Sequence, residues 1–361
     1  MSNNPAETSQ SEKPIKEGVF AENSRVEIDR KVSVAPMMDW TDRHCRYFLR
    51  GFSPRMLLYT EMVTAAAIVR GDRERLLRHS PEEQPLALQL GGSDAEQLAV
   101  AARIGADSGY VEINLNCGCP SDRVHAGAFG ACLMREPARV ADCVAAMRTA
   151  VPAHIPVTVK MRIGVLDAVQ RSAVDRYGDA DYENLQYFVR AVQGAGCRHF
   201  IVHARQAVLG ELSPRENREI PPLRYDVVRR LKQEFPSLWI AVNGGLRDIG
   251  QCRAALDWAD GIMLGREAYH RPQVLGELHA ELYPDGWRVP QLPALLERMA
   301  AYAARESALG TPLRAITRHM LGLASGRPGA RRFRQLLAQP PARFPLRQAA
   351  EALVAGGLAT G

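Results

Sequence analysis

The sequence contains few lysines and lacks the patterns of a secreted or membrane-spanning protein. Only five of its 361 residues are lysines, although arginines are frequent. No apolar run approaches the roughly 18 residues that a transmembrane helix needs, which excludes a protein built around such helices. Residues 1–28 are polar and lack the apolar core of a secretory signal. We therefore expect a disordered tail there.

The cysteine spacing excludes the common cysteine-based sites. The seven cysteines are an odd number and lack the paired C-x-x-C spacing of zinc ribbons and iron–sulfur centres. Free thiols in a long chain are typical of a reducing compartment. We therefore expect a cytoplasmic protein that holds no metal ion.

Positive charge is concentrated toward the C-terminus. The chain carries a formal charge of +6, whereas residues 286–361 contain eleven arginines against three glutamates, so that this segment is +8 and the rest is −2. Such an asymmetry is typical of a part of the chain that faces a polyanion. The alternative is that the chain simply uses arginine as its general surface cation.

Short apolar segments alternate with amphipathic segments of helical length. Eight segments are candidate strands: Val32–Ala35, Leu57–Glu61, Leu86–Leu90, Val111–Leu115, Val157–Met161, Phe200–His203, Trp239–Val242 and Gly261–Leu264. The candidate helices between them include Ala95–Ile104, Ala138–Thr149, Tyr182–Ala195, Tyr225–Glu234 and Ile249–Leu256. Eight strand–helix repeats favour a closed (β/α)₈ TIM barrel, which needs about 250 residues. We predict an α/β barrel over residues 29–280 and a small helical domain over residues 286–361.

Nearly every candidate strand ends in a polar side chain or a glycine. The residues at or just after these ends include Pro36, Met37, Met38, Gln89, Asn116, Lys160, His203, Asn243, Gly244, Gly245, Gly265 and Arg266. The chemistry of a TIM barrel takes place at the carboxyl ends of its strands. A purely structural barrel does not need polar groups there, so the pattern predicts a functional site.

The last two strands are followed by Asn243-Gly244-Gly245 and by Gly265-Arg266. Loops at these two places commonly bind phosphate in this fold, because glycine lets backbone N–H groups approach the oxygens. The Arg266 guanidinium can add a charged hydrogen bond. Taken alone, Asn-Gly-Gly is equally compatible with a simple turn.

Lys160 is isolated in the sequence, since no other lysine lies between Lys31 and Lys232. A compact ammonium at a strand end is typical of a group placed beside an anion. The alternative is a salt bridge at the rim of the barrel. His203 also has two interpretations: it can contact a ligand, or it can be a structural histidine, as histidines at strand ends often are.

One segment resembles a known family. Residues 114–121 read Asn-Leu-Asn-Cys-Gly-Cys-Pro-Ser, which resembles the signature of tRNA-dihydrouridine synthases. Similar segments run in order from about residue 31 to Arg334, and residues 39–47, 213–223 and 317–323 resemble the A subfamily. One departure is Cys117, where the family usually has an aliphatic residue. We assign chemistry to Cys119 and expect Cys117 to be a small core residue.

The resemblance implies an enzyme that reduces uridines 20 and 20a of the tRNA D-loop to dihydrouridine. Hydride from reduced FMN would reach C6 of the uracil, a proton from Cys119 would reach C5, and NADPH would reduce the flavin again. The implied FMN contacts are Pro36, Met37, Met38, Gln89, Lys160, His203, Asn243, Gly244, Gly245, Gly265 and Arg266. The implied tRNA contacts are Asn116, Arg215, Arg218, Arg331 and Arg334. A monomer without membrane partners is expected, because the concave surface must admit a tRNA.

Two other functions explain parts of the sequence. An FMN barrel that acts on a small molecule, such as a dihydroorotate-type dehydrogenase, accounts for the polar strand ends but not for the arginine-rich C-terminus. An RNA-binding barrel that has lost catalysis accounts for the arginines. It does not account for Cys119, Lys160 or the glycines that follow the last two strands.

Overall fold

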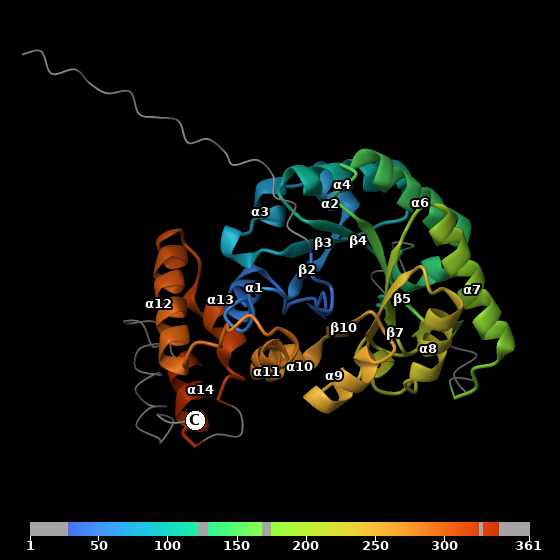
Figure 1. Cartoon of the computed structure of the whole chain (residues 1–361). Coiled ribbons are helices and arrows are strands. Elements are labelled where there is room, and N and C mark those ends of the chain that lie inside the picture. Colours follow the sequence, from blue (N-terminus) through green and yellow to red (C-terminus); the bar gives the residue numbers. More distant parts are fainter. Residues whose placement is uncertain (1–27, 122–128, 168–174, 325–327, 339–361) are drawn as a thin grey trace, which may run out of the picture.

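The chain folds around a closed barrel of eight parallel strands (Figure 1). The computed structural model describes residues 28–121, 129–167, 175–324 and 328–338. The barrel strands are β1 (Val32–Val34), β2 (Leu57–Thr64), β3 (Leu86–Gly91), β4 (Glu112–Cys117), β5 (Val157–Arg162), β7 (His199–His203), β9 (Trp239–Asn243) and β10 (Gly261–Leu264). β1 pairs with β10 and closes the ring. The predicted TIM barrel is confirmed, and each candidate strand overlaps a barrel strand.

Helices pack around the outside of the barrel. They are α1 (Arg43–Leu49), α2 (Ala65–Arg70), α3 (Arg73–Leu77), α4 (Ala95–Asp107), α6 (Pro137–Ala150), α7 (Asp179–Gly194), α8 (Tyr225–Glu234), α9 (Ile249–Leu256), α10 (Arg266–His270) and α11 (Gln273–Leu282). Aspartates start several of them, because a carboxylate accepts a hydrogen bond from a free N–H of the first turn. Asp94 accepts from Gln97 N, and Asp248 accepts from Gln251 N, each at 2.8 Å.

The strands alternate between two layers of the core. Side chains that point outward share one large apolar cluster with the helices. A separate, smaller cluster fills the barrel interior and consists of Ala35, Leu57, Tyr59, Ala87, Ile201, Ala241 and Met263. Because side chains of a strand alternate between its two faces, the residues two positions further along also face inward. These include Gln89, His203 and Asn243, so the predicted polar residues continue the interior face toward the carboxyl ends.

A second, two-stranded parallel sheet was not predicted. It pairs β6 (Val165–Asp167), which follows β5, with β8 (Ala207–Leu209), which follows β7. Strands of three residues are too short to show a period in the sequence. The long charged segment over residues 164–181 thus contains β6, and its residues 168–174 lie outside the described part of the chain.

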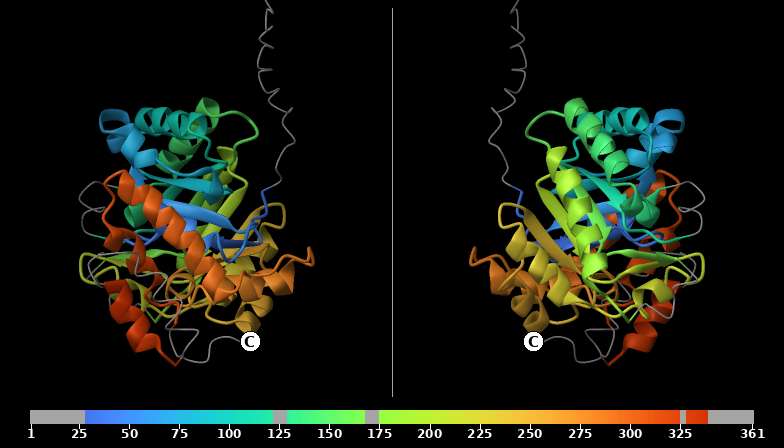
Figure 2. Two further views of the ribbon diagram at one scale, coloured as in Figure 1. Left: turned by 90° about the vertical axis from the view of Figure 1, so that its left-hand side faces the viewer. Right: turned by 90° about the vertical axis from the view of Figure 1, so that its right-hand side faces the viewer.

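Helices follow the barrel at the C-terminus, as predicted. They are α12 (Leu292–Ala308), α13 (Leu313–Thr317) and α14 (Ala330–Ala338), with a 3₁₀ turn, η5 (Arg318–Met320), between the last two. They lie together beside α1 and α11 (Figures 1 and 2). Their buried residues, such as Leu296, Ile316 and Phe333, belong to the same apolar cluster as the outer barrel layer. Residues 1–27 of the predicted tail, and residues 339–361, lie outside the described ranges.

The cysteines are free thiols, and all seven belong to the described ranges. Within those ranges, no three His, Cys, Asp or Glu side chains come together in a way that suits a metal ion. None of the helices described there has both the length and the apolar character needed to cross a bilayer.

Candidate active site

The predicted polar residues meet at the carboxyl ends of the barrel strands. Strand register places Asn116 beside Lys160, and His203 beside Asn243. Gln89 lies opposite Asn114 on the neighbouring strand. Closure of the ring brings the loop after β1 against the loop after β10. The fold therefore assembles one rim from residues that are remote from one another in the chain.

Asn116 holds the backbone at Cys119. Its Oδ1 accepts hydrogen bonds from the N–H groups of Gly118 (3.1 Å) and Cys119 (3.0 Å), and its Nδ2 donates to Gln89 Oε1 at 2.8 Å. Cys119 Sγ lies 3.6 Å from Ser121 Oγ. The Asn116 side chain therefore fixes the start of the loop that carries the thiol.

Cys117 and Cys119 occupy different environments although one residue separates them. Cys117 is the last residue of β4 and is fully buried, and this burial raises the pKa of its thiol well above the usual range. Cys119 lies beyond the strand and is partly exposed. The expectation that Cys117 is a core residue is confirmed, and Cys119 is the accessible thiol of the pair.

Lys160 and Arg162 place buried positive charge at this rim, and His203 lies beside them. Burial, helped by the charge of Arg162, lowers the pKa of Lys160 to about 8. Among the described residues, no carboxylate forms an ion pair with Lys160, so the alternative of a rim salt bridge is not supported. Burial and the nearby cations, Arg162 before Lys160, hold the pKa of His203 well below its usual range. His203 is therefore a neutral imidazole at physiological pH.

Arg162 is a site residue that the sequence analysis missed. It ends β5, is buried, and donates from Nε to the carbonyl of Gly118 at 2.9 Å. Its Nη1 donates to the carbonyls of Gln206 and Asn217, both at 3.0 Å. It therefore joins the Cys119 loop to the segment that carries Arg218. The sequence signal was its position two residues after Lys160, on the same inward face.

Gly244 and Gly245 have backbone conformations that disfavour other residues. Their φ angles are +109° and +75°. A Cβ atom at Gly244 would lie 2.6 Å from His203 Cδ2, and one at Gly245 would lie 2.3 Å from Leu223 Cδ1. Asn243 donates to the carbonyl of Met263 at 2.7 Å and ties this turn to β10. Neighbouring side chains already occupy the space that a Cβ atom would take, so only glycine fits this turn, which we call the glycine cradle; backbone N–H groups of such turns can bind a phosphate group.

Arginines surround this cradle. Arg266 begins α10 directly after Gly265, and its Nη1 donates to Glu219 Oε1 at 2.8 Å. Arg215 lies 3.5 Å from the same carboxylate and is largely exposed. The buried Nε of Arg218 has no hydrogen-bond partner in the described chain. Buried polar groups are seldom left unpaired, so this nitrogen also fits a site that receives an anion.

The loop after β1 completes the rim. Met37 N donates to Thr41 Oγ1 at 2.9 Å, which shapes the turn that follows Pro36. A Cβ atom at Gly265 would meet Met37 Sδ at 3.9 Å, so the two loops are neighbours with room between them. Met38 is 56% exposed. An exposed apolar side chain at a polar rim is suited to contact a flat ligand.

Arg331 and Arg334 lie apart from the rim, on α14. Both are exposed, whereas Phe333, Leu336 and Leu337 on the same helix are buried. α14 therefore has a buried apolar face and an exposed basic face. The chain therefore has two groups of candidate residues, one at the barrel rim and one on the C-terminal helices.

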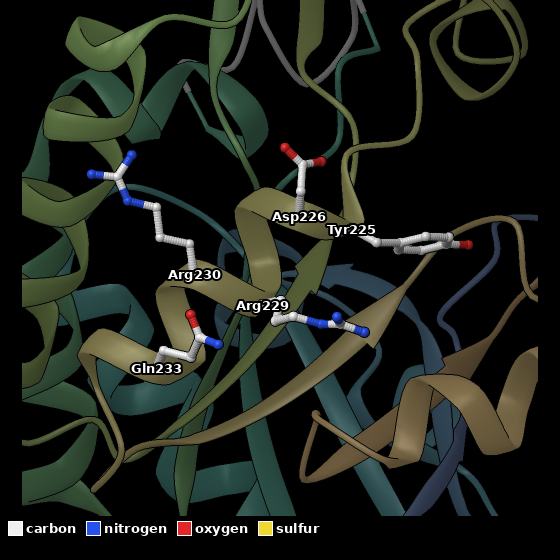
Figure 3. A pocket seen from close by; sticks show the side chains of 5 residues that line it. All are labelled: Tyr225, Asp226, Arg229, Arg230 and Gln233. Atoms are coloured by element: carbon white, nitrogen blue, oxygen red, sulfur yellow. The ribbon is translucent and has the colours of Figure 1, made fainter.

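A cavity of about 360 Å³ lies elsewhere, on the outer surface of α8. It is lined by Tyr225, Asp226, Arg229, Arg230 and Gln233. Figure 3 shows that the Arg230 and Tyr225 side chains point to opposite sides of the helix. Only Tyr225 reaches the rim, where its hydroxyl donates to the Gly244 carbonyl. This cavity is not the predicted site.

Known proteins resemble this chain over most of its length. The family model described as Dihydrouridine synthase (Dus) matches residues 33–351. A tRNA-dihydrouridine(20/20a) synthase of Pseudomonas syringae pv. tomato is 55% identical over 315 residues, covering 87% of this chain and 90% of the relative. Proteins of the same name from Xanthomonas axonopodis pv. citri and from Synechocystis are 53% and 50% identical, covering 88% of this chain and 91% and 90% of the relatives.

These matches confirm the resemblance that residues 114–121 indicated, including its A subfamily. They favour the predicted family over a small-molecule dehydrogenase and over an RNA-binding barrel without catalysis, because similarity extends through both the rim and the C-terminal helices. The chain belongs to the dihydrouridine synthase family, whose members are flavin-dependent oxidoreductases.

Proposed function

We propose that this enzyme reduces the C5–C6 double bond of uridines 20 and 20a in the D-loop of tRNA, with FMN as its cofactor and NADPH as its reductant. The names of its relatives support the substrate. The observation that carries the proposal is the placement of an accessible thiol, Cys119, on the same rim as Lys160 and the glycine cradle.

The residues of the rim fit FMN. Gly244, Gly245, Gly265 and Arg266 would hold its phosphate, since the two positive-φ glycines shape a turn that presents backbone N–H groups, Gly265 leaves open space and Arg266 supplies a guanidinium. Lys160, Gln89, His203, Asn243 and the segment Pro36, Met37 and Met38 would hold the rest of the cofactor. When bound in its reduced form, FMN supplies a hydride. The Lys160 ammonium would stabilise negative charge at that ring.

Cys119 would act as the general acid. A cysteine thiol is largely protonated at neutral pH, and so it can donate a proton to C5 of the uracil. The backbone N–H of Cys119 donates to Asn116 Oδ1, which holds the loop in place. Such a positioned acid contributes roughly 10²- to 10⁴-fold to the rate of a reaction.

The tRNA would contact both groups of candidate residues. An enzyme that acts on a base inside a folded RNA has to extrude it into a pocket. Asn116, Arg215 and Arg218 would contact the RNA at the rim, and Arg331 and Arg334 would contact phosphates from α14. We propose that residues 29–280 are the catalytic domain and residues 286–361 the tRNA-binding domain of a cytoplasmic monomer.

A pair of cysteine variants tests the proposal. Cys119→Ala should lower the rate of uridine reduction at least about a hundredfold, while FMN binding and NADPH oxidation stay near the wild-type level. Cys117→Ala is the matched control, because it removes the neighbouring thiol from the core. Its rate should stay near that of the wild type in protein that remains folded.

Mass spectrometry of tRNA provides the measurement. A strain without the gene should lose the two-hydrogen mass gain at the two D-loop uridines, and the wild-type gene should restore it. Survival of that gain with Cys119→Ala would contradict the assigned acid. Purified protein that stays colourless after FMN is added would contradict the whole proposal.

A further inference from the structure

A chain of hydrogen bonds crosses the barrel interior below the rim. At its lower end lies Glu112, which is completely buried at the start of β4. Thr158 Oγ1 donates to Glu112 Oε1 at 2.8 Å, and Asn114 Nδ2 donates to Thr158 Oγ1, also at 2.8 Å. Arg30 and Tyr59 donate to the same carboxylate and hold it in place.

The upper half of this hydrogen-bond path reaches the rim. Gln89 Nε2 donates to Asn114 Oδ1 at 2.8 Å, and Asn116 Nδ2 donates to Gln89 Oε1 at 2.8 Å. Asn116 Oδ1 then accepts the N–H groups of Gly118 and Cys119. All the side chains between Glu112 and the rim are at most 8% exposed. The result is one unbroken path from a buried carboxylate to the backbone of the proposed acid.

Both ends of this path have a fixed polarity. A carboxylate that faces a guanidinium only accepts hydrogen bonds, and a backbone N–H only donates them. Thr158 must therefore donate to Glu112 and accept from Asn114, and the three amides on the path, Asn114, Gln89 and Asn116, must turn their oxygens toward the rim. Flipping any one of these amides would place two donors or two acceptors opposite each other. The buried groups left without a partner would then destabilise the fold.

The fixed polarity limits what the rim can offer to a ligand. Asn116 Oδ1 already accepts two hydrogen bonds, and Nδ2 uses one of its two N–H groups on Gln89. The side chain can therefore offer a ligand one N–H donor. Gln89 has one N–H left beside the bond to Asn114. An amide that is free to rotate could present either its oxygen or its nitrogen to a ligand. The hydrogen-bond path leaves only the nitrogen of Asn116 available as a donor.

We propose that Glu112, Thr158 and Asn114 are positioning residues that set the orientation of Gln89 and Asn116 and, through Asn116, the backbone of Cys119. The inference rests on the proposed role of Cys119. It gives a reason for a buried carboxylate beside the apolar cluster of the barrel interior. Burying such a charge is costly unless it is paired and hydrogen-bonded.

Two substitutions of Thr158 separate positioning from packing. Thr158→Val keeps the shape but removes the hydroxyl, which leaves the Asn114 N–H unpaired and the amides above it free to turn. Thr158→Ser keeps the hydroxyl and removes the methyl group. Ser33→Ala is the control, because Ser33 is another buried barrel hydroxyl and it donates only to the carbonyl of Ile262, at 3.3 Å.

Single-turnover reduction of tRNA by the pre-reduced enzyme is the first measurement. Thr158→Val should slow this step about ten- to a hundredfold, since small misplacements of reacting groups have effects of that size. Thr158→Ser should stay within a few fold of the wild type. NADPH oxidation by the flavin should slow less than tRNA reduction in Thr158→Val, because that step does not use Cys119 and depends on the path only through Gln89.

Amide hydrogen exchange in the peptide over residues 116–121 is the second measurement, and it requires no catalysis. Exchange at Gly118 and Cys119 should be faster in Thr158→Val than in Thr158→Ser or Ser33→Ala. Should Thr158→Val not fold, Glu112→Gln replaces it, since an amide of the same size can also donate and so loses the fixed polarity.

Three results would overturn the inference. These are wild-type exchange in the valine variant, wild-type turnover in that variant, or equal losses in the valine and serine variants, which would indicate packing. A wild-type enzyme that reduces no uridine would instead contradict the proposed function, and the exchange data would still decide whether the path positions the loop.

Discussion

Cys117 and Cys119 show how position along a strand divides the roles of two identical side chains. Cys117 ends β4 with its thiol in the outer core, and Cys119 lies after the strand on the loop held by Asn116. Only the second thiol reaches the interior face that carries Gln89 and Lys160. Their chemistry differs because of burial, since the side chains themselves are the same.

Lys160 gives a prediction about pH. Its pKa of about 8 means that the ammonium is mostly present at neutral pH and is lost as the pH rises above that value. If it holds an anionic part of FMN, the affinity of the apoprotein for FMN should fall above about pH 8. Lys160→Arg should keep its affinity to higher pH, because a guanidinium remains protonated.

Fluorescence titration of the apoprotein with FMN, between pH 7 and pH 9 or so, measures this effect. Lys160→Gln serves as the reference, since it has no titrating group and should bind weakly with little change over the same range. An affinity that falls equally in the wild type and in Lys160→Gln would assign the pH dependence to another group.

Gly244 gives a prediction about backbone conformation. Gly244→Ala should weaken FMN binding about ten- to a hundredfold, because a Cβ atom would meet the His203 ring and the left-handed φ costs about 1–2 kcal/mol. Gly286→Ala is a matched control, as Gly286 has a φ of +77° with nothing within 4 Å. Equal FMN affinity of the two variants, measured by titration, would remove Gly244 from the cofactor site.

At the scale of elements, Asp42 connects the barrel to the C-terminal helices. It starts α1 by accepting the N–H groups of His44 and Cys45, at 3.0 and 2.9 Å. Its other bonds come from Arg318 Nη2 (2.6 Å) and His319 Nε2 (3.0 Å) on η5. One carboxylate thus caps a barrel helix and anchors the C-terminal helices beside the rim.

Asp42→Asn should separate these two roles. Asparagine is as good a helix cap as aspartate, so the variant keeps the cap and loses the charge that faces Arg318 and His319. The free energy of unfolding should fall by about 1–3 kcal/mol, as for other hydrogen bonds to charged groups. Asp72→Asn, at the start of α3, is the control, because Asp72 caps a helix without touching the C-terminal helices.

The same variant predicts a pH dependence. Burial opposes ionisation of Asp42, but the hydrogen bond and charge of His319, the Cys45 N–H and Arg318 together hold its pKa well below the usual range. A lowered folded-state pKa adds stability above the unfolded value of about 4, and that stability is lost as the pH falls below it. Urea unfolding should therefore show a difference between wild type and Asp42→Asn that is constant at neutral pH and shrinks below about pH 4.

At the scale of the whole molecule, the rim and α14 would grip one tRNA together. Replacing Arg331 and Arg334 by glutamine should weaken tRNA binding and reduce the slope of log affinity against log salt by about one unit for each phosphate that the variant no longer neutralises. Arg103 and Arg139, on α4 and α6 at the far side of the barrel (Figure 1), are matched controls. Equal salt slopes in the two double variants would exclude α14 from the tRNA interface.

The barrel could be predicted because its strands are short, buried and separated by amphipathic helices. The sheet of β6 and β8 could not, because three residues show no period. The roles of Arg162, Thr158 and Glu112 could not be predicted either, for a different reason: their partners lie on other strands or loops. Their residue types are ordinary, and only pairing across the barrel turns them into parts of the site.

The sequence by itself determined the order of strands and helices, the polar residues at the strand ends and the concentration of arginines toward the C-terminus, because these depend on local periodicity and on the order of residues along the chain. The tertiary structure decided which of two neighbouring thiols is accessible, which buried side chains support it and how η5 meets α1. Those outcomes depend on closure of the barrel, which fixes the distances between residues that are remote in the chain.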